Sequence, residues 1–371
     1  MIEDSKFVIT FYGKLRSFLN KKNVLIISPN FWGNVHITKH HYSLELHKLG
    51  ANIFYLNPPS RSLGAFLKTT EIFKNFNLID FQLHIPGRIK NYFPKLYYYY
   101  MGLIVKRISA IAGNDIFLSI DFSRDLPFSQ TKINYFNSKH KIFFPVDNPH
   151  LDYINNSKNI SDMYFSISED ILNMIDKGNI HHFCLGHSVS SDFFSKKIIN
   201  GKNDLSTVNV GYVGNLFMDN IDYETIIELV KKNKGINFHF IGPNTLINEN
   251  NNLGVQKDNK KNIRILKEQE NTTFHGILYK EKLVQLLAKL DAMFLCYFEV
   301  GSNPNAPVNS HKILEFLALG KVVISNYFED YKSYNDELIF MPEKNHTSDQ
   351  YIKKFKLVIS DLHKFNNKSL N

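Results

Sequence analysis

Cysteine and long apolar runs are scarce in this sequence. Its 371 residues include only two cysteines, Cys184 and Cys296, which lie far apart and have neither metal-ligand nor redox spacing. This excludes a disulfide framework and favours a reducing compartment. No apolar run approaches the roughly 20 residues that a membrane span needs, and Glu3, Asp4 and Lys6 interrupt the start of the chain, so we expect no signal peptide. The sequence therefore predicts a cytoplasmic protein.

A recognisable nucleic-acid-binding module is also missing, although the chain is basic. The net charge is +9, and residues 1–200 contain 23 Lys and Arg against 15 Asp and Glu, whereas residues 201–371 contain 21 against 20. A basic domain attracts anionic lipid, nucleic acid or a phosphorylated substrate, or is simply a soluble surface. We expect no nucleic-acid partner, which leaves a peripheral contact with the inner face of the cytoplasmic membrane among the alternatives.

Apolar residues are plentiful enough for two cores. The chain is 43% hydrophobic and 21% charged, and its length is about twice that of an ordinary domain. Short apolar runs alternate with segments of helical period, which predicts α/β layers around parallel sheets. In the first half we predict strands at 24–28, 52–56, 81–85, 116–120, 141–146, 163–167 and 182–185, and helices at 38–49, 95–112 and 169–176. In the second half we predict strands at 208–213, 237–241, 273–275, 292–297 and 322–325, and helices at 223–232, 280–290 and 311–319.

A polar stretch from Ser195 to Ser206 separates the two halves, and we place the domain boundary there. The predicted domains are an N-terminal one over residues 1–195 and a C-terminal one over residues 206–345. The polar segment 243–272 predicts an extended surface loop. The run Tyr97 to Tyr100 falls on a predicted helix, and we interpret it as core packing, with a membrane-surface or acceptor contact as the alternative.

The most informative segment runs from Glu299 to Gly320 and predicts a turn-rich loop followed by a helix. In an open parallel sheet, ligands bind beyond the carboxyl ends of the strands, where this loop begins. Backbone N–H groups at the helix start near Ser310 favour a phosphate, and Lys312 adds a positive charge. Glu315 lies three residues further on, where its carboxylate could accept hydrogen bonds from a ribose diol; the alternative is a surface Lys–Glu pair. The pattern favours a nucleoside diphosphate.

This segment, Ser310-His-Lys-Ile-Leu-Glu-Phe-Leu-Ala-Leu-Gly-Lys-Val-Val, resembles the donor-binding signature of bacterial GT-B glycosyltransferases of family 4. The signature has a Lys, a Glu three residues on, and then an aromatic residue, Ala and Gly before a β-branched strand. Residues 210–216 resemble the glycine turn of the same donor domain, and residues 238–243 and 273–276 resemble its next strand ends. The resemblance implies a nucleotide-sugar site made by Gly214, Asn215, Gly242, His275, Gly276, Ser310, His311, Lys312 and Glu315.

The same resemblance implies a fold and an activity. The fold is α/β of the GT-B type, with two Rossmann-like domains facing each other across a cleft and the acceptor bound by the first. The C-terminal residues 346–371, with a helix at about 350–361, should return to the N-terminal domain. The activity is hexosyl transfer from a nucleoside diphosphate sugar to a glycan or lipid-linked acceptor in the synthesis of capsule, lipopolysaccharide or another cell-surface polysaccharide. No cofactor and no metal are implied.

Two departures from the family pattern limit these implications. Retaining members of family 4 commonly have a Glu eight positions before the residue that matches Glu315, and Pro307 stands there in this chain. Retention is what the family implies, yet this position leaves inversion open. The Arg and Lys that often follow the glycine turn are replaced by Asn215 and residues 218–220, so Lys312 should provide a larger share of the positive charge at the phosphates.

An inverting transfer needs a base that removes the proton of the acceptor hydroxyl. Asp121, Asp147 and His187 are the candidates, with His41 as a further one, and we expect them on the cleft side of the first domain. Each also has a structural alternative, as a cap or as the partner of a backbone group. His40 and His41 are neighbours that face different sides of a helix, so we expect no shared metal.

Two other functions fit the same residues. A nucleotide-sugar epimerase of the same fold would turn over the donor without any acceptor. A non-catalytic sugar-nucleotide binding protein, which has lost its chemistry with the missing Glu and Arg, would bind the donor and form no product.

Overall fold

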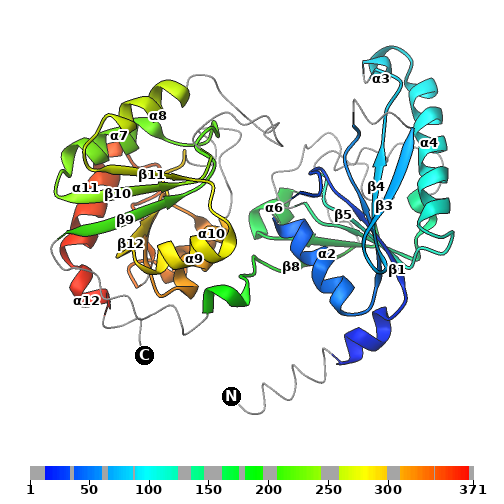
Figure 1. Cartoon of the computed structure of the whole chain (residues 1–371), viewed down its shortest axis with the longest axis horizontal. Helices are drawn as coiled ribbons and strands as arrows, with labels where there is room; N and C mark the ends of the chain where they lie inside the picture. Colours follow the sequence, from blue (N-terminus) through cyan, green and yellow to red (C-terminus); the bar gives the residue numbers. More distant parts are fainter. Residues whose placement is uncertain are drawn as a thin grey trace. The chain divides into compact units, whose positions relative to one another are not determined.

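The computed structural model describes residues 13–33, 37–60, 66–86, 88–123, 135–145, 161–174, 180–194, 207–243, 259–298, 310–337 and 339–366. The chain divides into two compact units, Met1–Leu185 and Gly186–Asn371, called the first and the second unit below. Each unit is built on its own, mainly parallel β-sheet with helices beside it (Figure 1). None of the helices in the described part of the chain combines the length and the apolar composition that crossing a bilayer requires.

The first unit contains an eight-stranded sheet in the order β3-β4-β2-β1-β5-β6-β7-β8. All neighbouring strands are parallel except β3 and β4. The strands are β1 (Asn23–Ile27), β2 (Asn52–Leu56), β3 (Leu67–Phe73), β4 (Phe76–Phe81), β5 (Leu118–Asp121), β6 (His140–Phe143), β7 (Met163–Ser166) and β8 (His181–Cys184). The helices are α2 (Thr38–Lys48), α3 (Ile89–Tyr92), α4 (Pro94–Ile111) and α6 (Glu169–Met174). The central strand β1 is almost entirely apolar and buried, as expected of a parallel strand covered on both faces.

The antiparallel hairpin of β3 and β4 was not predicted, and the predicted strand at 81–85 is wrong. β4 ends at Phe81, and the chain reverses between the two strands at Asn75, whose φ is +65°. Asparagine tolerates this left-handed conformation better than most residues, which makes it a frequent turn residue. The exposed face of β3 is polar, so its apolar signal in the sequence is weak.

The second unit contains a six-stranded sheet in the order β11-β10-β9-β12-β13-β14, with every neighbouring pair parallel. The strands are β9 (Val208–Val213), β10 (Ile236–Ile241), β11 (Thr272–Gly276), β12 (Ala292–Phe294), β13 (Val322–Ile324) and β14 (Ile339–Phe340). The helices are α7 (Tyr223–Lys232), α8 (Asn259–Lys267), α9 (Lys280–Ala288), α10 (His311–Ala318), α11 (Ser348–Ser360) and α12 (Leu362–Asn366). Their apolar side chains form one continuous core.

Helix α8 corrects the expectation of a surface loop over residues 243–272. Ile263 and Leu266, three residues apart on this helix, are buried in the core of the second unit. Asn259 at its start donates a hydrogen bond from Nδ2 to the carbonyl of Met218 at 2.8 Å. The helix is otherwise rich in Lys, Asn and Arg, so only a narrow apolar stripe signals it in the sequence.

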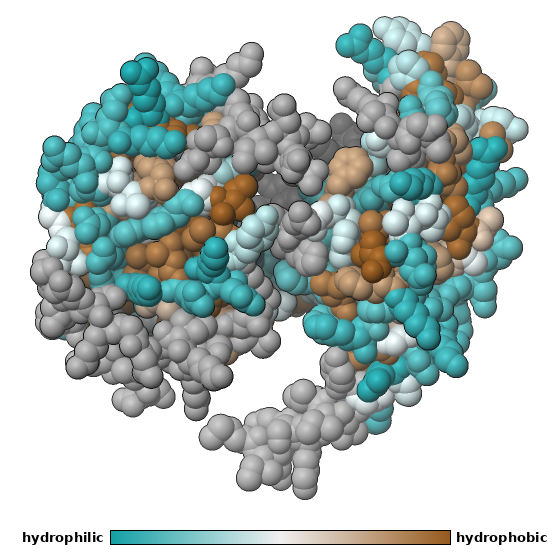
Figure 2. Space-filling model, in the orientation of Figure 1, coloured by the Kyte–Doolittle hydropathy of each residue, from teal (hydrophilic) through white to brown (hydrophobic). Residues whose placement is uncertain are grey.

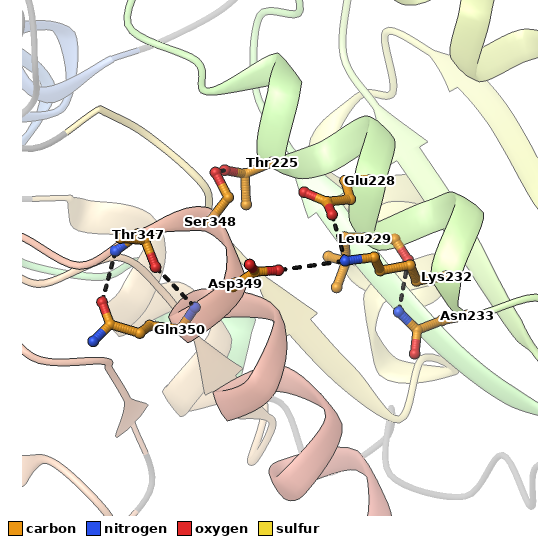
Figure 3. Close-up of polar contacts among 9 residues, drawn as sticks. All are labelled: Thr225, Glu228, Leu229, Lys232, Asn233, Thr347, Ser348, Asp349 and Gln350. Carbon is orange, nitrogen blue, oxygen red and sulfur yellow. Dashed lines mark hydrogen bonds and ion pairs between the residues drawn. The ribbon is translucent and has the colours of Figure 1, made fainter.

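Helix α11 packs within the second unit, so the expected return of the C-terminal helix to the first domain is wrong for the described residues. Tyr351 and Phe355 are fully buried in the core of the second unit, and Tyr351 Oη donates to the carbonyl of Leu295 at 2.8 Å. Figure 3 shows α11 beside α7, where Ser348 Oγ accepts a 2.6 Å hydrogen bond from Thr225. The apolar stripe of α11 therefore matches its own unit.

The start of α11 is fixed by its own sequence. Thr347 accepts a hydrogen bond from the N–H of Gln350, whose side chain accepts in turn from the N–H of Thr347 (Figure 3). This reciprocal capping box satisfies N–H groups that a helix start otherwise leaves open. Lys232 of α7 also forms ion pairs with Glu228 and Asp349, the latter at 3.3 Å.

The boundary between the units also differs from the prediction. Residues 186–194 belong to the second unit, because Phe193 is buried in its core, whereas we had placed them in the N-terminal domain. The predicted linker, 195–206, lies outside the described residues. A buried phenylalanine thus ties the chain to the second unit before the polar stretch begins.

Candidate functional site

Three glycines meet at the carboxyl ends of β9, β10 and β11. Gly214 donates its N–H to the carbonyl of Ile241 at 2.9 Å, and Gly242 donates to Gly276 at 2.8 Å. Gly242 has a φ of +140°, and a Cβ there would lie 1.9 Å from the carbonyl oxygen of Gly214. Only glycine allows this approach of two backbones. The structure therefore brings together the strand-end glycines that the sequence had suggested, at the edge where parallel sheets bind ligands.

Asn215 shapes the turn after Gly214. Its Oδ1 accepts a hydrogen bond from the N–H of Phe217 at 3.0 Å, and the N–H of Leu216 reaches the carbonyl of Pro243 at 3.3 Å. The first of these is the local side-chain bond typical of an asparagine turn. Asn215 thus fixes the turn against the end of β10.

Helix α10 begins at the carboxyl end of the same sheet, next to β13. Its N-cap residue Ser310 is buried and has extended backbone, and among the described residues no side chain caps the first N–H groups. The carbonyl of Ser310 accepts from the N–H of Ile313 at 3.1 Å and from Tyr331 Oη at 3.4 Å. These contacts hold the helix start in place, and its N–H groups and dipole favour an anion.

Lys312, in the first turn of α10, is held by Tyr297. Its Nζ donates a hydrogen bond to Tyr297 Oη at 3.1 Å and lies 5.7 Å from the centroid of the same ring. Tyr297 is itself buried, and its N–H bonds to Asn326 Oδ1 at 3.2 Å. A half-buried ammonium group that is fixed by a phenol is a good partner for phosphate oxygens. Sequence reasoning missed Tyr297, whose position at the end of the predicted strand 292–297 was the available signal.

Tyr212 is a second buried phenol that the sequence did not indicate. Its ring packs against that of Tyr297 at 6.3 Å, and a Cβ at Gly214 would lie 3.1 Å from its hydroxyl. Burial, together with the neighbouring phenols of Tyr297 and Tyr223, holds the pKa of Tyr212 well above 10.0. The hydroxyl is therefore neutral, and it makes no hydrogen bond of good geometry in the structure. A neutral donor thus lies beside the glycine turn.

Glu315 and two histidines complete the surroundings of α10. Glu315 lies one turn after Lys312 and is half-buried. The exposed His311 lies edge-on to His187, with 5.6 Å between the ring centroids. His187 belongs to the second unit, so our placement of this residue in the first domain is wrong. The segment 186–194 brings it to the start of α10, whereas we had treated it as part of the preceding domain.

His275 takes part in a hydrogen-bonded chain across β9, β10 and β11. His239 Nε2 lies 3.1 Å from Asn209 Oδ1, and His239 Nδ1 lies 3.0 Å from His275 Nε2. Asn209 donates its Nδ2 to the carbonyl of Thr207, so its Oδ1 accepts from His239, and neutral His239 then accepts from His275. Burial lowers the pKa of both imidazoles, with the neighbouring His275 lowering that of His239 further and Asp291 opposing. Both rings are thus neutral near pH 7.

The acidic candidates for catalysis lie in the first half of the chain. Asp121 ends β5 and is buried, and its Oδ1 accepts a 2.8 Å hydrogen bond from the N–H of Ser123 and another from the hydroxyl of the same residue. This is the structural alternative that the sequence left open. Asp147 lies outside the described residues. Within the described part of the chain, no group of three or more potential metal ligands occurs.

Comparison with known proteins defines the fold. No model of a known protein family matches the sequence, and no curated protein is similar to it. Solved structures do match over 94% of the chain at 11% identity. They include sucrose-phosphate synthase from Thermosynechococcus elongatus (94% of that chain, TM-score 0.64) and HepE from Anabaena in complex with UDP and glucose (92%, 0.62). A third is the UDP-forming α,α-trehalose-phosphate synthase from Burkholderia xenovorans, in complex with glucose-6-phosphate (95%, 0.61).

The chain has the GT-B fold. The expectation of an α/β protein with two Rossmann-like units is thereby confirmed. In this GT-B chain, the glycine turns, the start of α10 and the Tyr297–Lys312 pair all lie in the second unit. Gly214, Asn215, Gly242 and Gly276 follow three adjacent strands, and Ser310, His311, Lys312 and Glu315 follow on a single helix.

Proposed function

We propose that this chain is a glycosyltransferase of the family 4 type that transfers a hexosyl group from a nucleoside diphosphate sugar. The observation that supports it best is the contact between the turns of Gly214 and Gly242, which forms a glycine-lined edge in the unit that also presents Lys312 at a helix start. Structures of the same fold include complexes with UDP and UDP-glucose, so uridine nucleotides are the first donors to test.

In this proposal the second unit holds the donor. The diphosphate lies between the glycine turns and the first turn of α10, where Lys312 and the helix N–H groups offset its charge. Tyr297 positions the Lys312 ammonium, and Glu315 accepts hydrogen bonds from the ribose. Asn215, His275, Ser310 and His311 line the same edge. As the bond to the sugar breaks, negative charge grows on the departing diphosphate, so these groups stabilise the transition state more than the bound donor.

The acceptor in this proposal is a glycan or a lipid-linked saccharide of a cell-surface polysaccharide, bound by the first unit. Retention of the anomeric configuration needs no protein base when the departing phosphate takes the acceptor proton. An inverting enzyme would need Asp121, Asp147 or His187 as the base. The anomeric configuration of the product, read by NMR, separates the two cases.

The experiment that tests the donor site is a thermal-shift screen of nucleoside diphosphates and their sugars. A ligand that binds only the folded state stabilises it by about 2.7 kcal/mol at a hundred times its Kd. We expect one nucleotide to stabilise the wild type and expect Lys312→Ala and Glu315→Ala to abolish the shift. Lys332→Ala, at an exposed lysine of the same unit, is the control and should respond like the wild type. Equal shifts in all variants, or none in the wild type, would refute the proposed site.

A radiolabelled donor then separates transfer from the two other functions. Transfer moves the label to an added acceptor, whereas an epimerase changes the donor sugar without one. A binding protein gives the thermal shift and leaves the donor unchanged.

A further inference from the structure

The outer side of α3 and α4 in the first unit exposes large apolar side chains. Tyr92 is 77% exposed, Phe93 64%, Leu96 57%, Tyr99 67% and Leu103 39%. On α4, steps of three and four residues lead from Leu96 to Tyr99 and Leu103, which places the three within about 60° of the helix circumference. These residues are called the aromatic face below.

The aromatic face is not needed to pack α4 onto its sheet. The opposite side of the helix buries Met101, Ile104 and Ile108 in the core of the first unit. Of the tyrosine run, Tyr97 and Tyr100 pack against that core, and Tyr100 Oη accepts a hydrogen bond from the N–H of His84. Tyr99 points away, so the interpretation of the whole run as core packing is wrong at this residue. Helix α4 therefore has two apolar sides, and the core uses one.

The charges around the aromatic face are of one sign. The sequence between Asp80 and Asp115 contains no acidic residue. It contains the basic residues Arg88, Lys90, Lys95, Lys106 and Arg107. At about 100° per residue, Lys95 and Lys106 flank the apolar stripe of α4 on one side and Arg107 flanks it on the other. These three side chains are exposed. Their stems can cover apolar surface while the charged ends extend beyond it.

We propose that the aromatic face binds an anionic membrane surface, with α4 lying along the lipid headgroups. Tyrosine and phenylalanine rings are favoured at the level of the headgroups, and leucine side chains gain by entering the acyl boundary. The flanking lysines and arginine then meet anionic phosphates, which complement their charge. Figure 2 shows hydrophobic residues beside hydrophilic ones along the rim that α3 and α4 occupy in Figure 1. The surface is separate from the proposed donor site, which lies in the other unit.

Co-sedimentation of the full chain with vesicles tests this proposal. We expect binding to vesicles that contain phosphatidylglycerol to exceed binding to pure phosphatidylcholine by at least about tenfold, and to fall as salt rises. The double variant Leu96→Ser with Tyr99→Ser should weaken binding about tenfold or more. The matched control is Leu357→Ser with Tyr334→Ser, which removes a leucine and a tyrosine of similar exposure, 60% and 58%, from the second unit. The control should bind like the wild type.

A second pair of variants tests the charges. Lys95→Glu with Lys106→Glu should abolish the preference for anionic vesicles, whereas Lys353→Glu with Lys356→Glu, an equal change of net charge on exposed positions of α11, should reduce it only slightly. Equal loss in both pairs would overturn the proposal, because it would show attraction by overall charge. A concentration-dependent dimer that disappears with Leu96→Ser and Tyr99→Ser, without any vesicle binding, would also overturn it. The response to nucleotide should stay unchanged in every variant, which shows that each is folded.

Discussion

The two units close the carboxyl edges of their sheets in different ways. In the first unit, side chains do so: Asn57 Oδ1 accepts from the N–H of Trp32 at 2.8 Å, and Asp121 and Ser166 accept from N–H groups two residues further on. In the second unit, the backbones of Gly214 and Gly242 meet directly. An edge of bare backbone lets a phosphate approach N–H groups closely, whereas an edge of hydroxyl, amide and carboxylate groups suits a polyhydroxylated ligand. The difference favours the donor in the second unit and the acceptor in the first.

The largest expected effect comes from breaking the backbone-lined edge. Gly242→Ala places a Cβ against the Gly214 carbonyl at an unfavourable φ, and should destabilise the second unit by about 3 kcal/mol or more. Hydrogen exchange followed by mass spectrometry would locate the loss in the strands of that unit. Gly235→Ala is the control, because a Cβ there meets no atom within 4 Å. Similar protection in both variants would contradict the close contact.

The corresponding change in the first unit removes a side chain. Asn57 is buried, and its Nδ2 also donates to Asp80 Oδ1 at 2.7 Å. Asn57→Ala should therefore cost about 2 kcal/mol and increase exchange in β1, β2 and β4 alone. Asn52→Ala, at the opposite end of β2, removes more exposed hydrogen bonds and should cost less. If both variants lose the same stability, the side chains at the carboxyl edge have no special role.

A smaller effect should come from the phenol that holds Lys312. Tyr297→Phe keeps the ring above the ammonium and removes the 3.1 Å hydrogen bond, so donor affinity should fall about fivefold, or about 1 kcal/mol. Isothermal titration with the nucleotide from the screen measures this. Tyr334→Phe, at an exposed tyrosine of the same unit, should leave the affinity unchanged. A wild-type affinity in Tyr297→Phe would remove the positioning role from Tyr297.

The smallest effect concerns pH. The pKa of His239 lies below its ordinary value of 6.5 because of burial, so the unfolded chain binds this proton more tightly than the folded one. Stability of the second unit should therefore fall as the pH drops below 6.5, and level off below the folded pKa. The half-exposed ring limits the effect to less than about 1 kcal/mol. His239→Asn should flatten this slope in urea unfolding, while His182→Asn, at an exposed histidine of the first unit, should not.

Local patterns explain what the sequence could predict. The alternation of strands and helices predicted two α/β units, and Gly214, Gly242 and Gly276 are visible because each directly follows an apolar strand. The helix with Lys312 and Glu315 is continuous in the sequence, so its start could be located as well. These features depend on neighbouring residues, whose spacing the period of a strand or helix determines.

The rest depends on contacts between distant segments. Tyr297 and Lys312 meet only because the end of β12 lies beside α10, and His187 joins them through a boundary set by the burial of Phe193. The amphipathic pattern of α11 predicts that one side is buried, but does not say which unit buries it. Exposure of Tyr99 likewise depends on how α4 is turned about its axis.

The antiparallel strand β3 has a consequence for behaviour in concentrated solution. It ends the first sheet, and the residues along it include Lys68 and Glu71, both exposed. A charged edge discourages the addition of a strand from another molecule, which a bare parallel edge would invite. Replacing both charges with valine would create a sticky edge, and the chain would become prone to ordered aggregation while its native contacts stayed intact.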